Sequence, residues 1–383
     1  MSTHAKTPLV GDIASFMEEW APSWTAEEWD RVGLLVGEPS WPAARVWVAL
    51  ELTPELLARA LKQNVNLLLT HHPPLFKPLP NLRTDRPLVR RLLEAASRGL
   101  ALFAAHTNLD VAPGGVNDAL AARLGLGDLS SLEPAGRGKM VKVVVFTPPE
   151  AAEAVAQALF TAGAGRIGNY RECAFAAPGV GSYVPPPDGR PYRGAPGRPE
   201  QAPEQRLETI LPAARLAGAL AALGAAHPYE EPAVDVYPLT EGPAGYGLGR
   251  VGRLDPPLAP AEFAARAARE LGSPLAALAG APPERLSRVA VVGGSGGDYL
   301  AQAAAAGAGL LVTGEARYHA AEAAADLGLG LLTLGHFQTE QVIVEPWARR
   351  LSEAMAARGF NCEVVADRGG VDPWRPAAPV PEE

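Results

Sequence analysis

The chain has 383 residues, more than one hydrophobic core usually serves, so we predict two or three domains. Apolar residues make up 48% of the sequence, the formal net charge is -8 and the sequence pI is about 5.5. This composition indicates a globular protein and argues against nucleic acid as its main partner. The two cysteines form no spaced motif, and we find neither a signal peptide nor a membrane-spanning apolar run, so we expect a soluble, cytoplasmic protein without membrane partners.

Strands and helices alternate in the first third of the chain. The apolar spacing over 9–20 predicts an amphipathic helix that ends before Pro22. The elements expected next are a strand at 46–50, a helix at 54–62, a strand at 65–69, a helix at 88–99, a strand at 102–105 and a helix at 119–124. Strands that alternate with helices of this length favour βαβ units and a parallel sheet.

The pattern changes near Gly136. The elements expected here are strands at 141–146, 206–211 and 233–237, helices at 149–162 and 212–223, and two strand pieces within 172–184 on either side of Pro178-Gly179. The order β, α, β, β, α, β with an extra strand suggests a ferredoxin-like module. The Pro, Gly and Arg rich stretch 185–203 is expected to be a surface loop, and 242–252 a linker.

The βα alternation resumes from Phe263 onward. We predict a strand at 289–292, a glycine-rich turn at 293–297, a helix at 298–306, a strand at 310–313, a helix that opens at Tyr318 and a strand at 331–335. The tail after Trp374 is rich in Pro, Ala and Glu, and we expect 376–383 to be disordered.

Four of the seven histidines fall where an apolar strand ends. His71 and His72 follow the run at 65–69, and prolines at 73 and 74 prevent that strand from continuing. His106 and His336 each follow a similar run, and each is followed four residues later by a carboxylate, Asp110 and Glu340. In a turn of helix this spacing places both side chains on one face.

These strand ends predict a metal site. Ligands bind beyond the carboxyl ends of the strands in open α/β sheets, and neutral imidazole is the commonest protein ligand for metal ions. One such histidine is as readily a satisfied core residue or a helix cap. The metal site is favoured because the same combination, a histidine directly after an apolar strand, occurs three times in the chain.

The turn Gly293–Gly297 allows three interpretations. It is a tight turn that requires glycine, an anion-binding loop whose N–H groups precede a helix, or a nucleophile elbow of the G-x-S-x-G type centred on Ser295. It contains neither a P-loop lysine nor the complete dinucleotide fingerprint.

Five motifs, in their order along the chain, resemble the Nif-three-like dinuclear metal family, whose members are often labelled homologues of GTP cyclohydrolase I type two. These are Trp29-Asp30-x-Val32-Gly33-Leu34, His71-His72-Pro73, His106-Thr107-Asn108-Leu109-Asp110, Gly293-Gly294-Ser295-Gly296 and Gly335-His336-x-x-Thr339-Glu340. Residues 137–245, with the motif His227-Pro228-Tyr229-Glu230-Glu231-Pro232, resemble the PII-like insert of the longer members.

The resemblance implies an α/β core of two βα halves with mostly parallel sheets, interrupted by a ferredoxin-like α+β domain. The boundaries expected are 1–136 for the first half of the core, 137–245 for the insert, 246–375 for the second half and 376–383 for the tail. The resemblance also implies a homo-oligomer, a hexamer, that acts on a small-molecule substrate, with nucleotide-like compounds among the candidates.

The resemblance further implies two divalent ions, of Zn, Mn or Fe, held by His71, His72, Asp110, His336 and Glu340. Glu340 would bridge the ions, one of which would take His72 and Asp110 and the other His71 and His336. Adjacent side chains in an extended chain point to opposite sides, which agrees with one histidine for each ion. We place His106 beside the ligands, as a residue that orients them or carries a proton.

The expected activity is hydrolysis through a metal-bound water. Two alternatives remain: a non-enzymatic regulatory or scaffold protein whose PII-like insert senses a ligand, and a hydrolase that uses Ser295. Four residues depart from the family pattern: Arg31, Glu315, Phe337 and Gln341. Gln341 replaces an arginine, which would remove a positive charge beside the site and weaken the inference of a phosphate or nucleotide substrate.

Overall fold

The polypeptide divides into two units. Unit 1 comprises Met1–Glu133 and Gly245–Glu383, and unit 2 comprises Pro134–Ala244. The computed structural model describes residues 6–134, 140–168, 170–240 and 245–375. The tail 376–383, which we expected to be disordered, lies outside the described residues.

Unit 1 contains two sheets. The first has the strand order β1-β4-β3-β2-β15, formed by β1 (Gly33–Val36), β2 (Arg45–Ala49), β3 (Leu67–Thr70), β4 (Ala101–Ala104) and β15 (Glu363–Ala366). Its strands are parallel except β1, which pairs antiparallel with β4. The second has the order β11-β14-β13-β12-β10-β5, formed by β5 (Gly127–Pro134), β10 (Gly247–Leu258), β11 (Ala277–Gly280), β12 (Leu286–Val292), β13 (Leu310–Thr313) and β14 (Gly330–Thr333).

The central strands of the second sheet, β12, β13 and β14, are parallel to one another. Unit 1 therefore confirms the predicted α/β fold of two βα halves with mostly parallel sheets.

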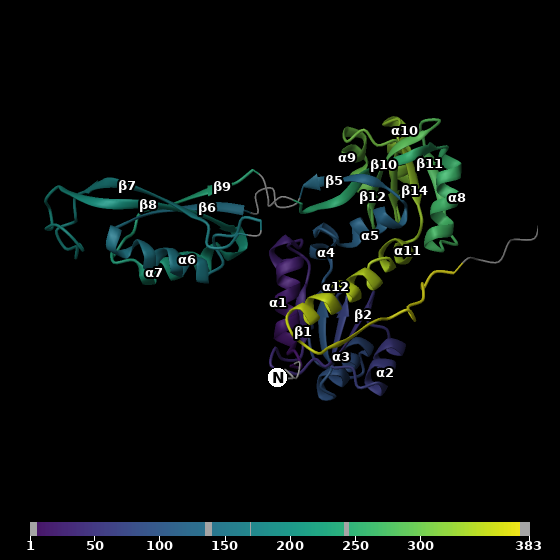
Figure 1. Ribbon diagram of the computed structural model, residues 1–383, viewed down its shortest axis with the longest axis horizontal. Coiled ribbons are helices and arrows are strands. Elements are labelled where there is room, and N and C mark those ends of the chain that lie inside the picture. Colours follow the sequence, from purple (N-terminus) through teal and green to yellow (C-terminus); the bar gives the residue numbers. More distant parts are fainter. Residues whose placement is uncertain (1–5, 135–139, 169, 241–244, 376–383) are drawn as a thin grey trace, which may run out of the picture. The chain divides into compact units, whose positions relative to one another are not determined.

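Helices cover the two sheets of unit 1 and lie between them (Figure 1). They are α1 (Val10–Trp20), α2 (Pro54–Lys62), α3 (Pro87–Ser97), α4 (Thr107–Val111), α5 (Val116–Arg123), α8 (Pro260–Leu271), α9 (Leu300–Ala305), α10 (Tyr318–Asp326), α11 (His336–Gln341) and α12 (Val344–Ala357), with short 3-10 turns at Ser23–Thr25 and Gly297–Tyr299. The start of α2 shows how the sequence sets a boundary. Thr53 caps the helix by accepting a hydrogen bond from the N–H of Leu56, and Pro54 occupies the first turn.

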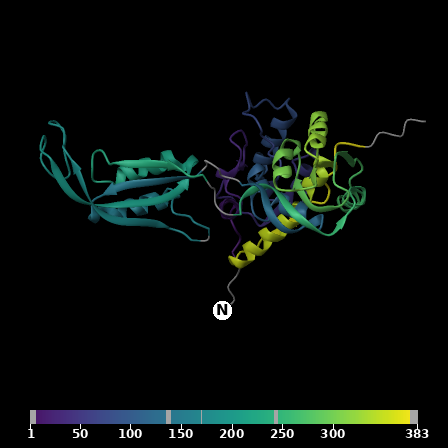
Figure 2. The same cartoon turned by 90° about the horizontal axis from the view of Figure 1, so that it is seen from above.

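Unit 2 has the order of elements β, α, β, β, α, β. They are β6 (Met140–Thr147), α6 (Ala152–Thr161), β7 (Ala174–Tyr183), β8 (Glu200–Pro212), α7 (Leu216–Ala226) and β9 (Val234–Pro238), with 3-10 turns at Pro149–Ala151 and Ala213–Arg215. The sheet order is β7-β8-β6-β9, which is the ferredoxin-like arrangement. Apolar side chains of β6 pack against those of α6 and α7, so both helices lie on one face of the sheet. β7 and β8 form an antiparallel hairpin, and Figure 2 shows the loop that joins them at one end of the sheet of unit 2.

Three sequence predictions differ from the fold. The stretch 242–252, expected to be a linker, includes the start of β10, which pairs with β12. Its glycines lower strand propensity, but Gly252 is needed because an added Cβ would lie within 3.0 Å of Leu129 and of the Gly127 carbonyl oxygen. The two strand pieces expected within 172–184 are one strand, β7, which tolerates Pro178 because β7 lies at the edge of its sheet. The loop expected at 185–203 is shorter, because β8 already begins at Glu200.

Candidate metal centre

His71 and His72 follow directly from β3. Every residue of β3 is buried, and the strand lies between β2 and β4, so it is covered on both faces. Both histidines leave the sheet at its carboxyl edge, and their ring centroids lie 5.2 Å apart.

His106 and Asp110 belong to the neighbouring strand end. Ala104, the last residue of β4, pairs with Thr70 of β3, so the chain after each strand emerges at the same edge of the sheet. His106 immediately precedes α4, which contains Asp110. The ring centroids of His106 and His71 lie 5.1 Å apart.

His336 and Glu340 come from the second sheet of unit 1. β14 ends at Thr333, and α11 begins at His336 after Gly335, whose φ is +90°. One turn of helix separates His336 from Glu340, and Nε2 of His336 lies 3.0 Å from Oε2 of Glu340. This contact confirms the helical i, i+4 spacing that the sequence predicts.

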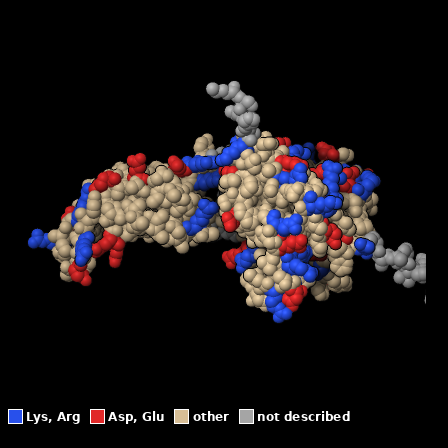
Figure 3. Space-filling view, turned by 90° about the horizontal axis from the view of Figure 1, so that it is seen from below, with Lys and Arg blue, Asp and Glu red and all other residues tan. Residues whose placement is uncertain are grey.

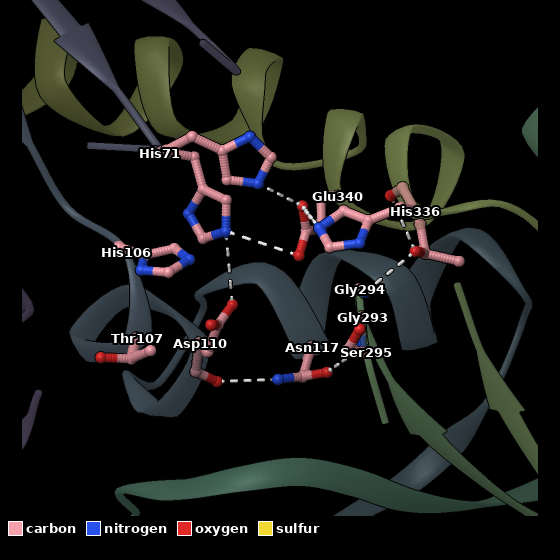
Figure 4. A network of polar contacts seen from close by, with 12 residues as sticks. His71, His106, Thr107, Asp110, Asn117, Gly293, Gly294, Ser295, His336 and Glu340 are labelled. Carbon is pink, nitrogen blue, oxygen red and sulfur yellow. Dashed lines mark hydrogen bonds and ion pairs between the residues drawn. The ribbon is translucent and has the colours of Figure 1, made fainter. Parts of the chain in front are cut away.

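The three strand ends meet at Glu340 (Figure 4), which is only 4% exposed. Oε2 of Glu340 lies 2.8 Å from Nε2 of His72 as well as 3.0 Å from Nε2 of His336. Oε1 lies 3.8 Å from Nε2 of His71, which is in turn 3.7 Å from Oδ1 of Asp110. The structure therefore brings together all five residues that we expected to bind metal.

The contacts divide these residues differently from the pairing expected from the sequence. His72 groups with His336 on one oxygen of Glu340, whereas His71 faces the other oxygen and Asp110. The expected pairing came from the resemblance, and the opposite directions of adjacent side chains in an extended strand agreed with it. β3 ends at Thr70, however, whose hydroxyl donates to the carbonyl of His72, and Nε2 of both rings lies near the carboxylate of Glu340 in α11.

His71 provides a direct test of whether the residues fit a metal ion. Its Nδ1 lies 3.0 Å from the carbonyl oxygen of Ala105, so in the neutral ring Nδ1 donates the proton and Nε2 keeps a free lone pair. This Nε2 is buried and has no hydrogen-bond partner among the described residues. A buried ring nitrogen that faces two carboxylates and is fixed from its other side matches the usual environment of a metal-binding histidine. The residues therefore fit a divalent ion.

The charges of the two carboxylates lead to the same conclusion. Burial and the charge of Glu340 raise the pKa of Asp110 to about 7. Burial also tends to raise the pKa of Glu340, but contacts with His336, His71 and His72 outweigh this effect and hold that pKa well below its usual value. The hydrogen bond to Glu340 raises the pKa of His336 to about 9. A divalent cation would relieve the repulsion between the two carboxylates.

His106 is held by Asp30, whose role the sequence did not indicate. Nδ1 of His106 lies 3.0 Å from Oδ1 of Asp30, and Oδ2 accepts hydrogen bonds from the N–H and hydroxyl of Thr107. Burial opposes ionisation of Asp30, but these contacts outweigh it and lower its pKa to about 2. The ionised carboxylate holds the proton on Nδ1 of His106 and leaves Nε2 as an acceptor. A ring nitrogen of His106 lies within 4.8 Å of one in His71 and one in His72.

The N–H groups of the loop Gly293–Gly297 are largely used within the protein. Those of Gly293 and Gly294 donate to the side-chain oxygens of Asn117 and Thr339, and that of Gly296 donates to the hydroxyl of Thr313. These three groups are therefore not free to bind an anion. Glycine is required at Gly294, where φ is +62° and an added Cβ would lie well within 3.0 Å of Oε1 of Glu340. The geometry favours the tight turn, packed against Glu340.

Ser295 does not have the contacts of a nucleophile elbow. Its hydroxyl donates to Oε1 of Glu315, and the same oxygen lies 3.2 Å from Nδ1 of His336. In a Ser-His-acid triad the histidine lies between the serine and the acid, whereas here the acid lies between the serine and the histidine. Glu315 instead orients His336, as carboxylates do for metal-binding histidines.

Gln341 lies away from the cavity beside the ligands. Its side chain lies 3.4 Å from the carbonyl oxygen of Asp367 and lines a separate cavity, because consecutive residues of α11 face different directions. The substitution for arginine therefore does not remove a charge from the wall of the site, contrary to our expectation from the sequence.

The fold and the site define an α/β protein whose histidines and carboxylates gather at the carboxyl edges of two sheets, a candidate metal-binding protein. The family model for Duf34/NIF3 (NGG1p interacting factor 3) matches residues 8–369, and the chain belongs to this family. The resemblance found in the sequence motifs is thereby confirmed.

Relatives and solved structures cover nearly the whole chain. It is 36% identical over 362 residues to the "GTP cyclohydrolase 1 type 2 homolog" of Halalkalibacterium halodurans, covering 94% of this chain and 97% of that protein. It is 36% identical over 370 residues to the protein of the same name in Bacillus subtilis, covering 97% and 99%. A Bacillus cereus protein related to NIF3 has a similar structure, with a TM-score of 0.73, 37% identity and coverage of 97% of this chain and 100% of that one. Staphylococcus aureus protein SA1388 has a TM-score of 0.74 at 28% identity, covering 97% and 99%.

Two further observations, on the helices and on the surface charge, bear on the expected partners. Within the described part of the chain, every helix is too short or too polar to cross a lipid bilayer. On the face of unit 1 shown in Figure 3, Lys and Arg are interspersed with Asp and Glu, and no broad area of positive charge is seen. That face lacks the electrostatic character of a nucleic-acid interface.

Proposed function

We propose that the protein is a metal-dependent hydrolase with a dinuclear centre. The observation that carries this proposal is the convergence of three histidines from both halves of unit 1 on the buried carboxylate of Glu340. When bound, two divalent ions would supply Lewis acidity, which acidifies water and polarises the bond to be cleaved. The names of the Halalkalibacterium and Bacillus relatives are consistent with hydrolytic chemistry.

We assign the ligands from the contacts. One ion would be held by His72, His336 and Oε2 of Glu340, and the other by His71, Asp110 and Oε1 of Glu340. Three protein ligands for each ion leave coordination positions for water and substrate, as in catalytic rather than structural sites. The mixture of imidazole and carboxylate ligands suits Zn, Mn or Fe.

His106 would carry a proton during the reaction. Asp30 fixes its Nδ1 as a donor, which leaves Nε2 as the base on the side of the other histidines. An imidazole held in one tautomer by a buried, ionised carboxylate can take a proton from the attacking water and return it to the leaving group.

The cavity beside these residues supports a small-molecule substrate. Its volume is about 840 Å³, within the range of small-molecule sites. Trp29 and Phe76 line it and are 57% and 46% exposed. Each packs edge-on against His106, with ring centroids 6.0 Å and 5.6 Å apart. Exposed aromatic walls favour a substrate with a planar ring, such as a nucleotide-like compound.

The test is to measure bound metal and turnover in the same preparations. We expect about two divalent ions per chain by elemental analysis, and hydrolysis of at least one member of a substrate panel by metal-loaded protein. Glu340→Ala should abolish that turnover, whereas Gln341→Ala, on the same helix but outside the cavity, should retain it. A metal content well below one ion per chain in protein never exposed to chelator would refute the centre. Labelling of Ser295 by a fluorophosphonate would favour the serine hydrolase instead.

A non-enzymatic regulatory protein is the second candidate, because unit 2 contains a cavity of its own. Metal retention without turnover across the panel, in parent and variants alike, would favour this alternative. In either case we expect a cytoplasmic homo-oligomer, a hexamer. Light scattering measures its mass, and a monomer mass would contradict the assembly.

A further inference from the structure

Unit 2 has a cavity that is open to solvent and contains none of the residues of the candidate metal centre. Its volume is about 640 Å³, and its walls come from β7, the loop that follows, β8 and the segment before β9. A cavity of this size is typical of sites for small molecules. The side chains that line it therefore indicate which kind of ligand it would accept.

Three tyrosines line one part of the cavity. The ring of Tyr229 lies between those of Tyr183 and Tyr192, at centroid distances of 6.2 Å and 6.0 Å. All three hydroxyls donate hydrogen bonds within the protein. The hydroxyl of Tyr229 donates to Glu204, that of Tyr183 to the carbonyl oxygen of Arg193, and that of Tyr192 to Glu150. The rings are thus held in place. The guanidinium of Arg193 lies over the ring of Tyr192, 6.0 Å from its centroid, whereas the rings of Tyr183 and Tyr229 present the negative charge of their π-systems to a ligand.

A buried carboxylate lies beside these rings. Glu204 is only 8% exposed, and one of its oxygens accepts the hydrogen bond from Tyr229 at 3.0 Å. Gly181 on the paired strand leaves room for this carboxylate, because an added Cβ would lie well within 3.0 Å of its oxygens. A buried carboxylate of this kind usually has a cation as its partner.

The protein itself supplies no such cation in its described part. No described Lys, Arg or His forms an ion pair with Glu204, Glu230 or Glu231, all of which line the cavity. Arg206 also lines it, but Arg206 pairs with Glu208 at 2.6 Å and packs over the ring of Phe146. The charge of the cavity is therefore negative.

The motif His227-Pro228-Tyr229-Glu230-Glu231-Pro232 builds this wall. Nδ1 of His227 accepts the N–H of Tyr229 at 3.1 Å, so its Nε2 is the donor to the carbonyl of Phe146, also at 3.1 Å. The ring of His227 also packs edge-on against that of Tyr229, with centroids 4.9 Å apart. The histidine thus acts as a neutral clamp that ties the motif to the end of β6 and fixes Tyr229 in the cavity.

We propose that this cavity binds an organic cation, a quaternary or protonated amine with an apolar body. Aromatic rings beside a buried carboxylate without a cationic partner are the means by which proteins recognise ammonium groups. The remaining walls, which include Phe146, Pro185 and Val184, would contact the apolar part of the ligand.

Choline and its uncharged carbon isostere, 3,3-dimethylbutan-1-ol, test the proposal, because they share a shape and differ in charge. Titration calorimetry of the full-length protein at low salt should show saturable binding of choline and at least about tenfold weaker binding of the isostere. Glu204→Gln and Tyr229→Leu should each weaken choline binding by about tenfold or more, whereas Tyr229→Phe, which keeps the ring, should weaken it less. Glu200→Gln and Tyr237→Leu, in the same sheet but outside the cavity, serve as matched controls and should bind choline like the parent.

Equal affinity for the two compounds, or no saturable binding of choline by the folded parent, would overturn the proposal. Unchanged choline affinity in Glu204→Gln would place the binding elsewhere and overturn it too. Since Tyr229→Leu removes a packed ring, its thermal unfolding is compared with that of Tyr237→Leu. If it does not fold, Glu204→Gln alone decides the outcome.

Discussion

Gly294→Ala probes the metal centre from a residue that offers no ligand atom. Gly294 has φ of +62° and packs against Glu340, whose carboxylate oxygen Oε1 would lie well within 3.0 Å of the new Cβ. A carbon and an oxygen in contact normally lie about 3.3 Å apart, so one of the two groups has to move by about 1 Å.

Two separate costs follow from this substitution. An alanine in the left-handed conformation loses roughly 1–2 kcal/mol of stability wherever it occurs. The displacement of Glu340 is specific to this site, because that carboxylate is buried and touches His72 and His336. Metal and catalytic sites tolerate errors of about 0.5 Å, so a shift of about 1 Å in Glu340 should lower metal affinity by roughly 10 to 100-fold.

Gly272→Ala is the matched control. Gly272 ends α8 with φ of +64°, and an added Cβ there meets nothing within 4 Å. This variant should show the loss in unfolding temperature that the left-handed conformation causes, but it should keep its metal. Elemental analysis after dialysis, together with thermal unfolding, separates the two costs. If Gly294→Ala retained metal as well as Gly272→Ala does, the position that we assign to the Glu340 carboxylate would be wrong.

Three further predictions concern the ligands, the support of His106 and the insert. Glu340→Gln should lose more metal than His106→Ala, because a bridging carboxylate supplies charge to both ions whereas a neighbouring group changes affinity by roughly 10 to 100-fold; equal metal content in the two variants would refute the bridge. The pKa of Asp30 is lowered from 3.8 to about 2 in the folded protein, so its ionised carboxylate adds about 2 kcal/mol to the free energy of unfolding above pH 3.8. This contribution is lost as the pH falls from 3.8 through about 2, so the stability difference between the parent and Asp30→Asn should shrink over that range in an acid titration. A stability difference that stays constant would contradict the role of Asp30. Replacement of 137–245 by a short Gly/Ser linker should leave a folded core with both ions and altered substrate access, selectivity or assembly; a folded product without metal would show that the insert contributes to the site.

The local elements around the site could be predicted because each is encoded over a few residues. The run Leu67–Leu69 is fully buried, and the strand predicted at 65–69 spans Leu67–Thr70, directly before the two histidines. The spacing of His336 and Glu340 requires only one turn of helix, which α11 supplies. Such patterns depend on hydrophobic periodicity and on residues that stop an element, and both can be recognised in a single sequence.

The contacts across the site could not be predicted in the same way. His72 and Glu340 are 268 residues apart in the chain, and their contact depends on how the two sheets of unit 1 pack. Asp30 reaches His106, 76 residues away, because β1 pairs antiparallel with β4 and places Gly33 opposite Ala104. The resemblance implied a pairing of His71 and His72 that differs from the contacts, in which both rings lie near the carboxylate of Glu340. Tertiary packing therefore determines which of these side chains contact one another, whereas the sequence indicates only the set.

The point of insertion explains how unit 1 accommodates unit 2. β5 and β10, which flank the insert, are neighbours in one sheet, and Gly247 of β10 packs so closely on Ser131 and Glu133 that a Cβ would clash with both. The chain therefore leaves unit 1 and returns to it at adjacent positions, which is the condition under which a domain can be inserted without distorting its host. The hydrophobic core of unit 2 is formed by residues of unit 2 alone, from Val141 to Val234. The candidate metal ligands, which follow β3 or belong to α4 and α11, thus depend on a core that unit 2 does not share.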